Sequence, residues 1–177
     1  MKNNNKKIIV FSGKQFSGKD TVAKIILNRF SNFKRIGIAD AIKMQYSQKT
    51  GLSLEEIEKN KPIYRQDLID LGDWGRAKHP HFWLNSIIAY EGDIIVTDLR
   101  VKDELNLFKE HGAFTVRVEA SEDVRAKRGQ LASKNDATET GLDDVNDWDF
   151  VIHNEGTYEE LVENTKELIE KIKEIID

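Results

Sequence analysis

The sequence contains no cysteine and only two prolines among its 177 residues. Without cysteine there can be no disulfide framework and no thiolate metal site, so any catalysis must use oxygen and nitrogen groups. The chain also lacks a long apolar run. The stretch Ile8 to Phe11 near its start is far too short for a signal-peptide core or a membrane span. We therefore expect a cytoplasmic protein without a membrane partner.

The chain carries little net charge, since 27 Lys and Arg residues stand against 31 Asp and Glu residues, giving a formal charge of −4. A charge of this sign gives no general attraction to a nucleic acid polymer, so any anion must be drawn by local groups. The hydrophobic share of 39% and the charged share of 33% are ordinary for a globular domain. A chain of this length fits one compact domain, and we expect a monomer with one active site.

Short apolar runs alternate with helical patterns, which predicts an α/β fold: a three-layer αβα sandwich around a five-stranded parallel sheet. The run from Ile8 to Phe11 is apolar throughout, as is typical of a strand buried on both faces. Apolar positions at helical spacing follow from Thr21 to Phe30. The other expected strands are Arg35 to Ala39, Asp93 to Thr97, Phe114 to Glu119 and Asp149 to His153, and the last expected helix is Tyr158 to Ile176.

Two segments of different character interrupt this alternation. The residues from about 40 to 90 have a helical pattern that Pro62 and Pro80 divide, and we expect this insertion to bind the acceptor substrate. The residues from about 121 to 146 are polar and lack sustained apolar periodicity, so we expect a mobile flap, or lid. The core of the single domain is then expected at about 7–39, 93–120 and 147–177.

A glycine-rich loop, Gly-Lys-Gln-Phe-Ser-Gly-Lys, follows the first expected strand at residues 13–19. Its spacing lets backbone N–H groups wrap around a polyphosphate, with Gly13 and Gly18 permitting an approach that a β-carbon would block. Lys19 can bridge the β- and γ-phosphates, and the next helix directs the positive end of its dipole at the same anion. The expected ATP contacts are Gly13, Ser17, Gly18, Lys19, Asp20, Thr21 and Arg125.

The residue after the loop lysine is Asp20, where a serine or threonine usually ligates magnesium. A carboxylate is a hard oxygen ligand that can hold Mg²⁺ directly or through water, and the hydroxyl of Thr21 is the alternative. Asp98 follows the expected strand Asp93 to Thr97, and ligands of open α/β sheets bind at such carboxyl ends. We expect Asp20 or Thr21, with Asp98, at the metal, and ATP with Mg²⁺ as the co-substrate.

Several arginines are placed to bind phosphate. Arg100 emerges from the same strand end as Asp98, and Arg125 and Arg128 are three residues apart at the start of the flap, on one helical face. Such cations can close over a transferring phosphoryl group, where charge stabilisation does most of the catalytic work. We expect Lys19, Arg100 and Arg128 to be the catalytic set. No general base is evident, which favours a phosphate acceptor, whose second pKa of about 6 leaves it largely ionised.

The loop with its flanks, residues 11–20, resembles the phosphate loop of animal-type phosphomevalonate kinases, in which aspartate also follows the lysine. The resemblance continues in order through Ile42–Leu52, Tyr64 to Pro80, Thr97–Arg100 and Gly141–Asn154, which is nearly the whole chain. It implies phosphorylation of phosphomevalonate by ATP in isoprenoid biosynthesis. By the same resemblance Arg65, Arg76 and Arg100 would bind the acceptor, and Arg128 would lie on the closing flap. The resemblance also implies that Lys14 faces the phosphates and is a further ATP contact.

The sequence departs from that family at two places. The family has a more basic loop where this chain has Gln15 and Phe16, and a second arginine where this chain has Val101. Phage deoxynucleoside monophosphate kinases are similar as well, through residues 17–21, the Asp-x-Arg strand end and the Thr-Glu-x-Gly-Leu element at residues 138–142. A (deoxy)nucleoside monophosphate kinase is therefore the alternative function.

A non-catalytic P-loop nucleotide-binding module is the second alternative. The sequence has no Asn-Lys-x-Asp element to read guanine, which disfavours a GTP switch. Gly13 and Gly18 also lack the Gly-x-Gly-x-x-Gly spacing of dinucleotide-dependent oxidoreductases. The sequence thus favours an ATP-dependent kinase acting on a small phosphorylated molecule.

Overall fold

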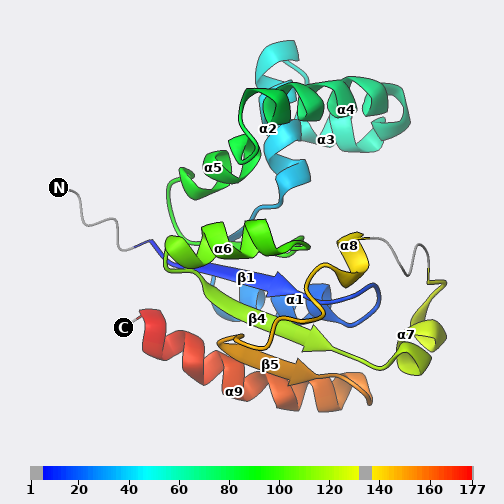
Figure 1. The fold of residues 1–177 in the computed structure, drawn as a ribbon, viewed down its shortest axis with the longest axis vertical. Helices are drawn as coiled ribbons and strands as arrows, with labels where there is room; N and C mark the ends of the chain where they lie inside the picture. The colour runs from blue at the N-terminus through cyan, green and yellow to red at the C-terminus, as the bar shows by residue number, and fades with distance from the viewer. Residues whose placement is uncertain (1–5, 132–136, 177) are drawn as a thin grey trace. The chain divides into compact units, whose positions relative to one another are not determined.

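The computed structural model describes residues 6–131 and 137–176. Two compact units separate within it: one is Ile36–Tyr90, and the other consists of the described residues before and after that stretch (Figure 1). No helix of the described residues is both long and apolar enough to cross a bilayer. The elements in chain order are β1 (Ile8–Ser12), α1 (Lys19–Arg29), β2 (Lys34–Arg35), α2 (Ile38–Thr50), α3 (Leu54–Lys59), α4 (Lys61–Lys78), α5 (Phe82–Ile88), β3 (Ile94–Val96), α6 (Lys102–Glu110), β4 (Phe114–Glu119), α7 (Glu122–Arg128), α8 (Ala137–Thr140), β5 (Phe150–His153) and α9 (Tyr158–Ile176).

The first unit is built on a parallel sheet with the strand order β2-β3-β1-β4-β5. β1 lies at its centre, where Val10 is in register with Val96 of β3 on one side and with Thr115 of β4 on the other. All five residues of β1 are buried, as its continuous apolar run predicts for a central parallel strand. The prediction of a five-stranded parallel sheet is confirmed.

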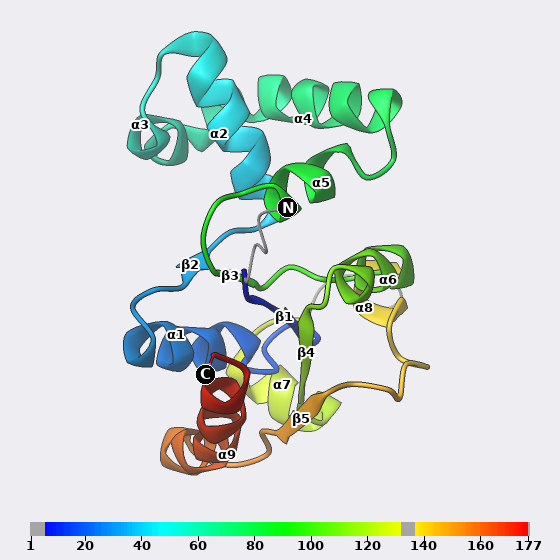
Figure 2. The same ribbon diagram turned by 90° about the vertical axis from the view of Figure 1, so that its left-hand side faces the viewer.

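Helices cover both faces of this sheet. Phe11 of β1 belongs to a buried apolar cluster with Ile26 of α1 and Leu168 of α9, and Figure 2 shows α1 and α9 side by side on that face. Side chains alternate along a strand, so Val10 points to the opposite face, which α6 covers (Figure 1). Leu105 and Phe108 of α6 are buried. The sheet therefore forms the middle of three layers.

The second unit consists of α2 to α5, in agreement with the helical pattern of residues 40–90. Its largest buried side chain is that of Trp83 on α5, which is 3% exposed. The indole Nε1 of Trp83 donates a hydrogen bond to the carbonyl of Gly72 on α4, at 3.0 Å. Gly75 is required beside it, because a β-carbon there would lie 2.6 Å from the indole ring. The backbone of α4 thus packs directly against the indole ring of Trp83 on α5.

The second strand was expected over Arg35 to Ala39, and this prediction is wrong. The strand is only Lys34–Arg35, and α2 already begins at Ile38. The reason is a helix cap, since the carboxylate of Asp40 accepts a hydrogen bond from the backbone N–H of Gly37 at 3.0 Å. This contact stabilises the first helical turn, so the apolar residues that follow β2 belong to a helix.

The segment expected to form a flap over residues 121–146 contains two helices, α7 and α8. Its residues 132–136 lie outside the described residues. At the start of α7, the backbone N–H and the hydroxyl of Ser121 both donate to the carboxylate of Glu155, each at 2.7 Å. The lack of apolar periodicity therefore does not mean a lack of helix here, because α7 is held by polar contacts.

Candidate active site

The glycine-rich loop joins the end of β1 to the first turn of α1, and its two glycines are required for different reasons. Gly18 is the residue before α1 and has a φ of 99°, a left-handed conformation that side chains with a β-carbon rarely adopt. Gly13 is required by space, because a β-carbon would lie 2.4 Å from Ser17 Oγ and 2.6 Å from the carbonyl oxygen of Val118. The loop can therefore fold tightly against β4.

The start of α1 offers several groups to an anion. The N-cap residue of this helix is Gly18, which has no side chain to cap the first backbone N–H groups, and such N–H groups can bind an anionic ligand. The Nζ of Lys19 lies 3.2 Å from Asp20 Oδ2, with the lysine side chain 13% exposed and the aspartate side chain 67% exposed. The Oγ of Ser17 is buried and has no hydrogen-bond partner among the described residues. A buried hydroxyl of this kind is usually paired, which points to a ligand.

The two arginines of α7 reach the loop, as their spacing predicts, but they bind its carbonyl oxygens. Arg125 donates from Nη1 to the carbonyl of Gln15 at 3.3 Å. Arg128 donates from Nη1 to the carbonyl of Phe16 at 3.3 Å and from Nη2 to the carbonyl of Asn154 at 3.0 Å. In this arrangement the guanidinium groups hold the tip of the loop, and Arg125 is itself buried.

Asn154 connects three parts of the site and was missed by sequence reasoning. It directly follows β5 and is 5% exposed. Its side-chain Nδ2 donates to the carbonyl of Ser17 at 2.8 Å, and its Oδ1 accepts from Arg128 Nη2 at 3.2 Å. Its backbone N–H donates to the carbonyl of Glu119 at 2.7 Å. The available signal was a polar side chain at the carboxyl end of a strand, which is where such sheets bind ligands.

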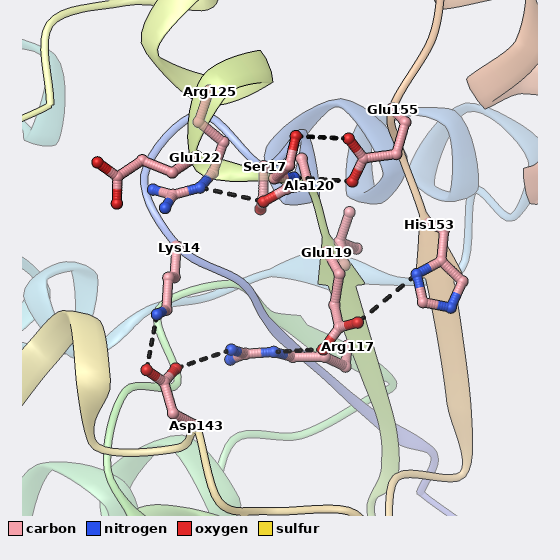
Figure 3. Close-up of a pocket in the computed structure, with 12 residues that line it drawn as sticks. Lys14, Ser17, Arg117, Glu119, Ala120, Glu122, Arg125, Asp143, His153 and Glu155 are labelled. Carbon is pink, nitrogen blue, oxygen red and sulfur yellow. Dashed lines mark hydrogen bonds and ion pairs between the residues drawn. The ribbon is translucent and has the colours of Figure 1, made fainter.

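A polar cavity of about 470 Å³ lies beside the loop at the ends of β4 and β5. Its volume falls in the usual range for a small-molecule site. Figure 3 shows Lys14 and Arg117 converging on Asp143, whose carboxylate accepts from Lys14 Nζ at 2.6 Å and from Arg117 Nη2 at 3.4 Å. Of the residues predicted at ATP, the cavity brings together Lys14, Ser17 and Arg125. The other lining residues are Arg117, Val118, Glu119, Ala120, Ser121, Glu122, Asp143, His153 and Glu155.

Arg117 is a second residue that sequence reasoning missed. It lies inside β4 and is 7% exposed, so its charge must be compensated within the protein. Besides Asp143 it binds the hydroxyl of Ser12, from Nη1 at 2.9 Å, and its guanidinium lies 5.7 Å from the centre of the Trp148 ring. The available signal was a cation between two valines within a strand.

At the end of β3, Arg100 is held by two carboxylates. Its backbone N–H donates to Glu104 Oε2 at 2.9 Å, and its Nη1 lies 3.4 Å from Glu139 Oε1. Burial raises the pKa of Glu104 above its usual value, and the nearby negative charge of Asp98 acts in the same direction. Hydrogen bonds from the backbone N–H groups of Arg100 and Val101 oppose this rise. Asp98 and Arg100 thus emerge together at the carboxyl end of the strand.

The remaining predicted residues, Arg65 and Arg76, belong to the helical unit, where both line a cavity of about 450 Å³. Arg76 donates from Nη2 to Asp73 at 2.7 Å. Arg65 is exposed and makes no hydrogen bond or ion pair with any residue that the structure describes. The rest of the lining combines lysines with aliphatic side chains: Ala39, Ile42, Lys43, Lys61, Leu68, Ile69 and Gly72.

A parallel sheet in the order β2-β3-β1-β4-β5, with a glycine-rich phosphate loop between β1 and α1, defines the class of P-loop kinases. Over residues 11–114, more than half of the chain, the sequence matches a family model described as phosphomevalonate kinase. The chain belongs to the phosphomevalonate kinase family, and the prediction that it is a kinase is confirmed.

Solved structures share this fold across almost their full lengths. Shikimate kinase from Aquifex aeolicus has a TM-score of 0.52 at 18% identity, with 94% of this chain and 96% of that chain covered. Shikimate kinase from Acinetobacter baumannii, in complex with shikimate, has a TM-score of 0.56 at 12% identity, with 97% and 95% covered. A gluconokinase from Sinorhizobium meliloti has a TM-score of 0.52 at 18% identity, with 96% and 97% covered. At such identities the likeness establishes the fold.

Proposed function

We propose that this kinase transfers the γ-phosphoryl group of ATP to the phosphate of a small phosphorylated metabolite, with phosphomevalonate as the acceptor. The observation that carries the proposal is the loop at residues 13–19, where Lys19, the buried hydroxyl of Ser17 and the uncapped start of α1 converge. Anionic phosphates are bound well at such a helix start, because N–H groups and the helix dipole act together. The polar cavity beside the loop would take a further part of the nucleotide.

The residues after the loop support the use of magnesium. Asp20 offers an exposed carboxylate, Thr21 a hydroxyl, and Asp98 a carboxylate at the end of β3. No cluster of three or more acidic or histidine side chains that could hold a metal occurs among the described residues. This fits Mg²⁺, which binds through one or two carboxylates together with substrate phosphates. Bound Mg²⁺ would neutralise charge on the transferring phosphate oxygens.

The cavity of the helical unit supports an aliphatic acceptor. Lys43, Lys61, Arg65 and Arg76 supply cations around it, while Ile42, Leu68 and Ile69 supply apolar surface. Phosphomevalonate is a short branched aliphatic chain with a phosphate and a carboxylate, and this combination of cations and aliphatic surface suits it. A nucleoside monophosphate would bring a base, which commonly stacks on aromatic side chains, and the described lining of this cavity contains none. We therefore place phosphomevalonate ahead of nucleotides.

The proposed step is an in-line displacement. An oxygen of the acceptor phosphate forms a bond to the γ-phosphorus of ATP while the bond from that phosphorus to the β–γ bridging oxygen breaks, and ADP leaves. The acceptor phosphate has a second pKa of about 6, so it is largely ionised at neutral pH and needs no general base. Lys19 and Arg100 would stabilise the charge on the oxygens of the transferring group and of the acceptor.

A coupled ADP-release assay tests the proposal. Phosphomevalonate and the four deoxynucleoside monophosphates would be compared at fixed Mg-ATP, with each acceptor varied to give kcat and KM. Lys19→Met should lower kcat by about 100-fold or more, because it removes a cation from the transferring phosphate. Lys24→Met is the matched control on the exposed side of α1, and it should retain the activity of the unchanged protein.

The outcomes separate the three candidate functions. The highest kcat/KM with phosphomevalonate supports the proposal, whereas a higher value with a deoxynucleoside monophosphate reassigns the acceptor. Equal background ADP release with every acceptor, together with heat on titration of Mg-ATP, would indicate a non-catalytic nucleotide-binding module. Full activity of Lys19→Met would refute the proposed mechanism.

A further inference from the structure

Glu139 on α8 has an unusual position for a carboxylate. Its side chain is only 4% exposed, yet it lies between the phosphate loop and the end of β3. One oxygen, Oε2, accepts a hydrogen bond from the backbone N–H of Gln15 at 3.0 Å, and the other, Oε1, lies 3.4 Å from Arg100 Nη1. Glu139 therefore contacts the third residue of the loop and the arginine at the strand end at the same time.

A buried carboxylate is costly unless charged and polar partners compensate it. An apolar residue at this place would avoid that desolvation cost. We therefore look for the role of the carboxylate in the two groups that its oxygens contact. Gln15 belongs to the segment that contacts the nucleotide in the proposed function, and 39% of the Arg100 side chain is exposed. The charge of Glu139 orients Arg100 without covering it.

We propose that Glu139 is a positioning residue, which holds the guanidinium of Arg100 at the phosphate loop so that Arg100 is oriented to bind the phosphate of the acceptor. This role rests on the proposed function. It predicts an effect on the acceptor that passes through Arg100, while contacts of the nucleotide with Lys19 and α1 stay as they are.

Other roles of Glu139 would change the two KM values differently. Glu139 could instead compete with the phosphates of ATP for the loop. In that case removing its charge would lower the KM for Mg-ATP. A purely structural role would lower thermal stability and the active fraction, and hence kcat, but would leave both KM values unchanged. The acceptor KM, the Mg-ATP KM and the melting temperature together distinguish these roles.

The test uses the full chain and the variant Glu139→Gln, which keeps the shape and a carbonyl oxygen for the N–H of Gln15 but removes the charge. We expect the acceptor KM to rise about tenfold, the effect of losing one charge-assisted hydrogen bond, and the Mg-ATP KM to stay within about twofold. The variant Glu139→Asp keeps the charge on a shorter side chain and should recover part of the loss. Asp144→Asn is the matched control, an exposed carboxylate of the same segment that pairs with Lys102.

A double-mutant cycle with Arg100→Gln tests whether the effect passes through Arg100. In the Arg100→Gln background, Glu139→Gln should change the acceptor KM by less than about twofold. A full tenfold effect in that background, an unchanged acceptor KM in the single variant, or a lowered KM for Mg-ATP would each overturn the inference. Absence of turnover in the unchanged protein would overturn the proposed function itself, and this role with it.

Discussion

Replacing Asn154 with alanine should loosen the phosphate loop from the end of β5. The side chain of Asn154 donates from Nδ2 to the carbonyl of Ser17 at 2.8 Å, and its Oδ1 accepts from Arg128 at 3.2 Å. Both Asn154 and Ser17 are buried, with 5% and 1% of their surface exposed. Water cannot readily replace the lost donor, so the carbonyl of Ser17 would be left without its partner.

The expected magnitude follows from these two contacts. Leaving a buried acceptor unsatisfied costs about 1–3 kcal/mol, and losing the hydrogen bond from the charged Arg128 costs about 1.5–3 kcal/mol. The second cost is at the low end, because Arg128 Nη2 also donates to the carbonyls of Asn154 and Gly156. We expect a loss of about 2.5–4.5 kcal/mol in the free energy of unfolding, a large part of the 5–15 kcal/mol typical of a domain.

Urea unfolding of the full chain, followed by circular dichroism, would measure this loss. Asn164→Ala is the matched control, because exposed Asn164 makes a similar contact with the carbonyl of His153, at 3.2 Å. It should cost less than about 1 kcal/mol, since water replaces an exposed hydrogen bond. Equal unfolding free energies for Asn154→Ala and the unchanged protein, with equal Mg-ATP affinity, would refute the reasoning.

Three further changes test other parts of the chain. Gly75→Ala places a β-carbon 2.6 Å from the ring of buried Trp83. It should destabilise the helical unit by about 1–3 kcal/mol, which thermal unfolding would measure. An unchanged melting temperature would contradict this packing. Glu104→Gln should change the pH dependence of stability. The folded pKa of Glu104 is raised, so its favourable contribution is present below the unfolded value of about 4.3 and is lost as the pH rises through the folded pKa. Urea unfolding from about pH 4 to 7 should therefore show the unchanged protein losing stability relative to Glu104→Gln, and the reverse trend would contradict the burial argument. Arg65→Met should raise the acceptor KM about tenfold and change the KM for Mg-ATP little, because this cation lines the cavity and makes no ion pair with a described residue. Equal acceptor KM values for the variant and the unchanged protein would show that Arg65 does not bind the acceptor.

Local patterns sufficed for much of the fold. The apolar run at Ile8 predicted β1 because a strand buried on both faces needs apolar side chains in both directions. The spacing of Leu161, Leu168 and Ile172 predicted α9 with its correct ends. The predicted extent of the second strand was wrong, because the apolar spacing there fits both a strand and a helix. The hydrogen bond from the N–H of Gly37 to the carboxylate of Asp40 caps the helix and decides between the two.

Some assignments stay predictions. The roles of residues 40–90 in binding the acceptor and of residues 121–146 as a mobile lid are inferred from sequence. The same is true of the monomeric state, the cytoplasmic location and the metal ligands. The kinase class, by contrast, is established by the family match over residues 11–114.

The phosphate loop could be recognised from the sequence, because phosphate binding depends on backbone N–H groups and on residues adjacent in the chain: Gly13, Gly18 and Lys19. Which side chains hold that loop could be seen only in the folded protein. Glu139 and Asn154 contact it from 124 and 137 residues away, and such contacts leave no periodic pattern in the chain. The arginines of α7 were predicted to reach the phosphate region, but which of their partners are carbonyls depends on how β4 and β5 pack against β1.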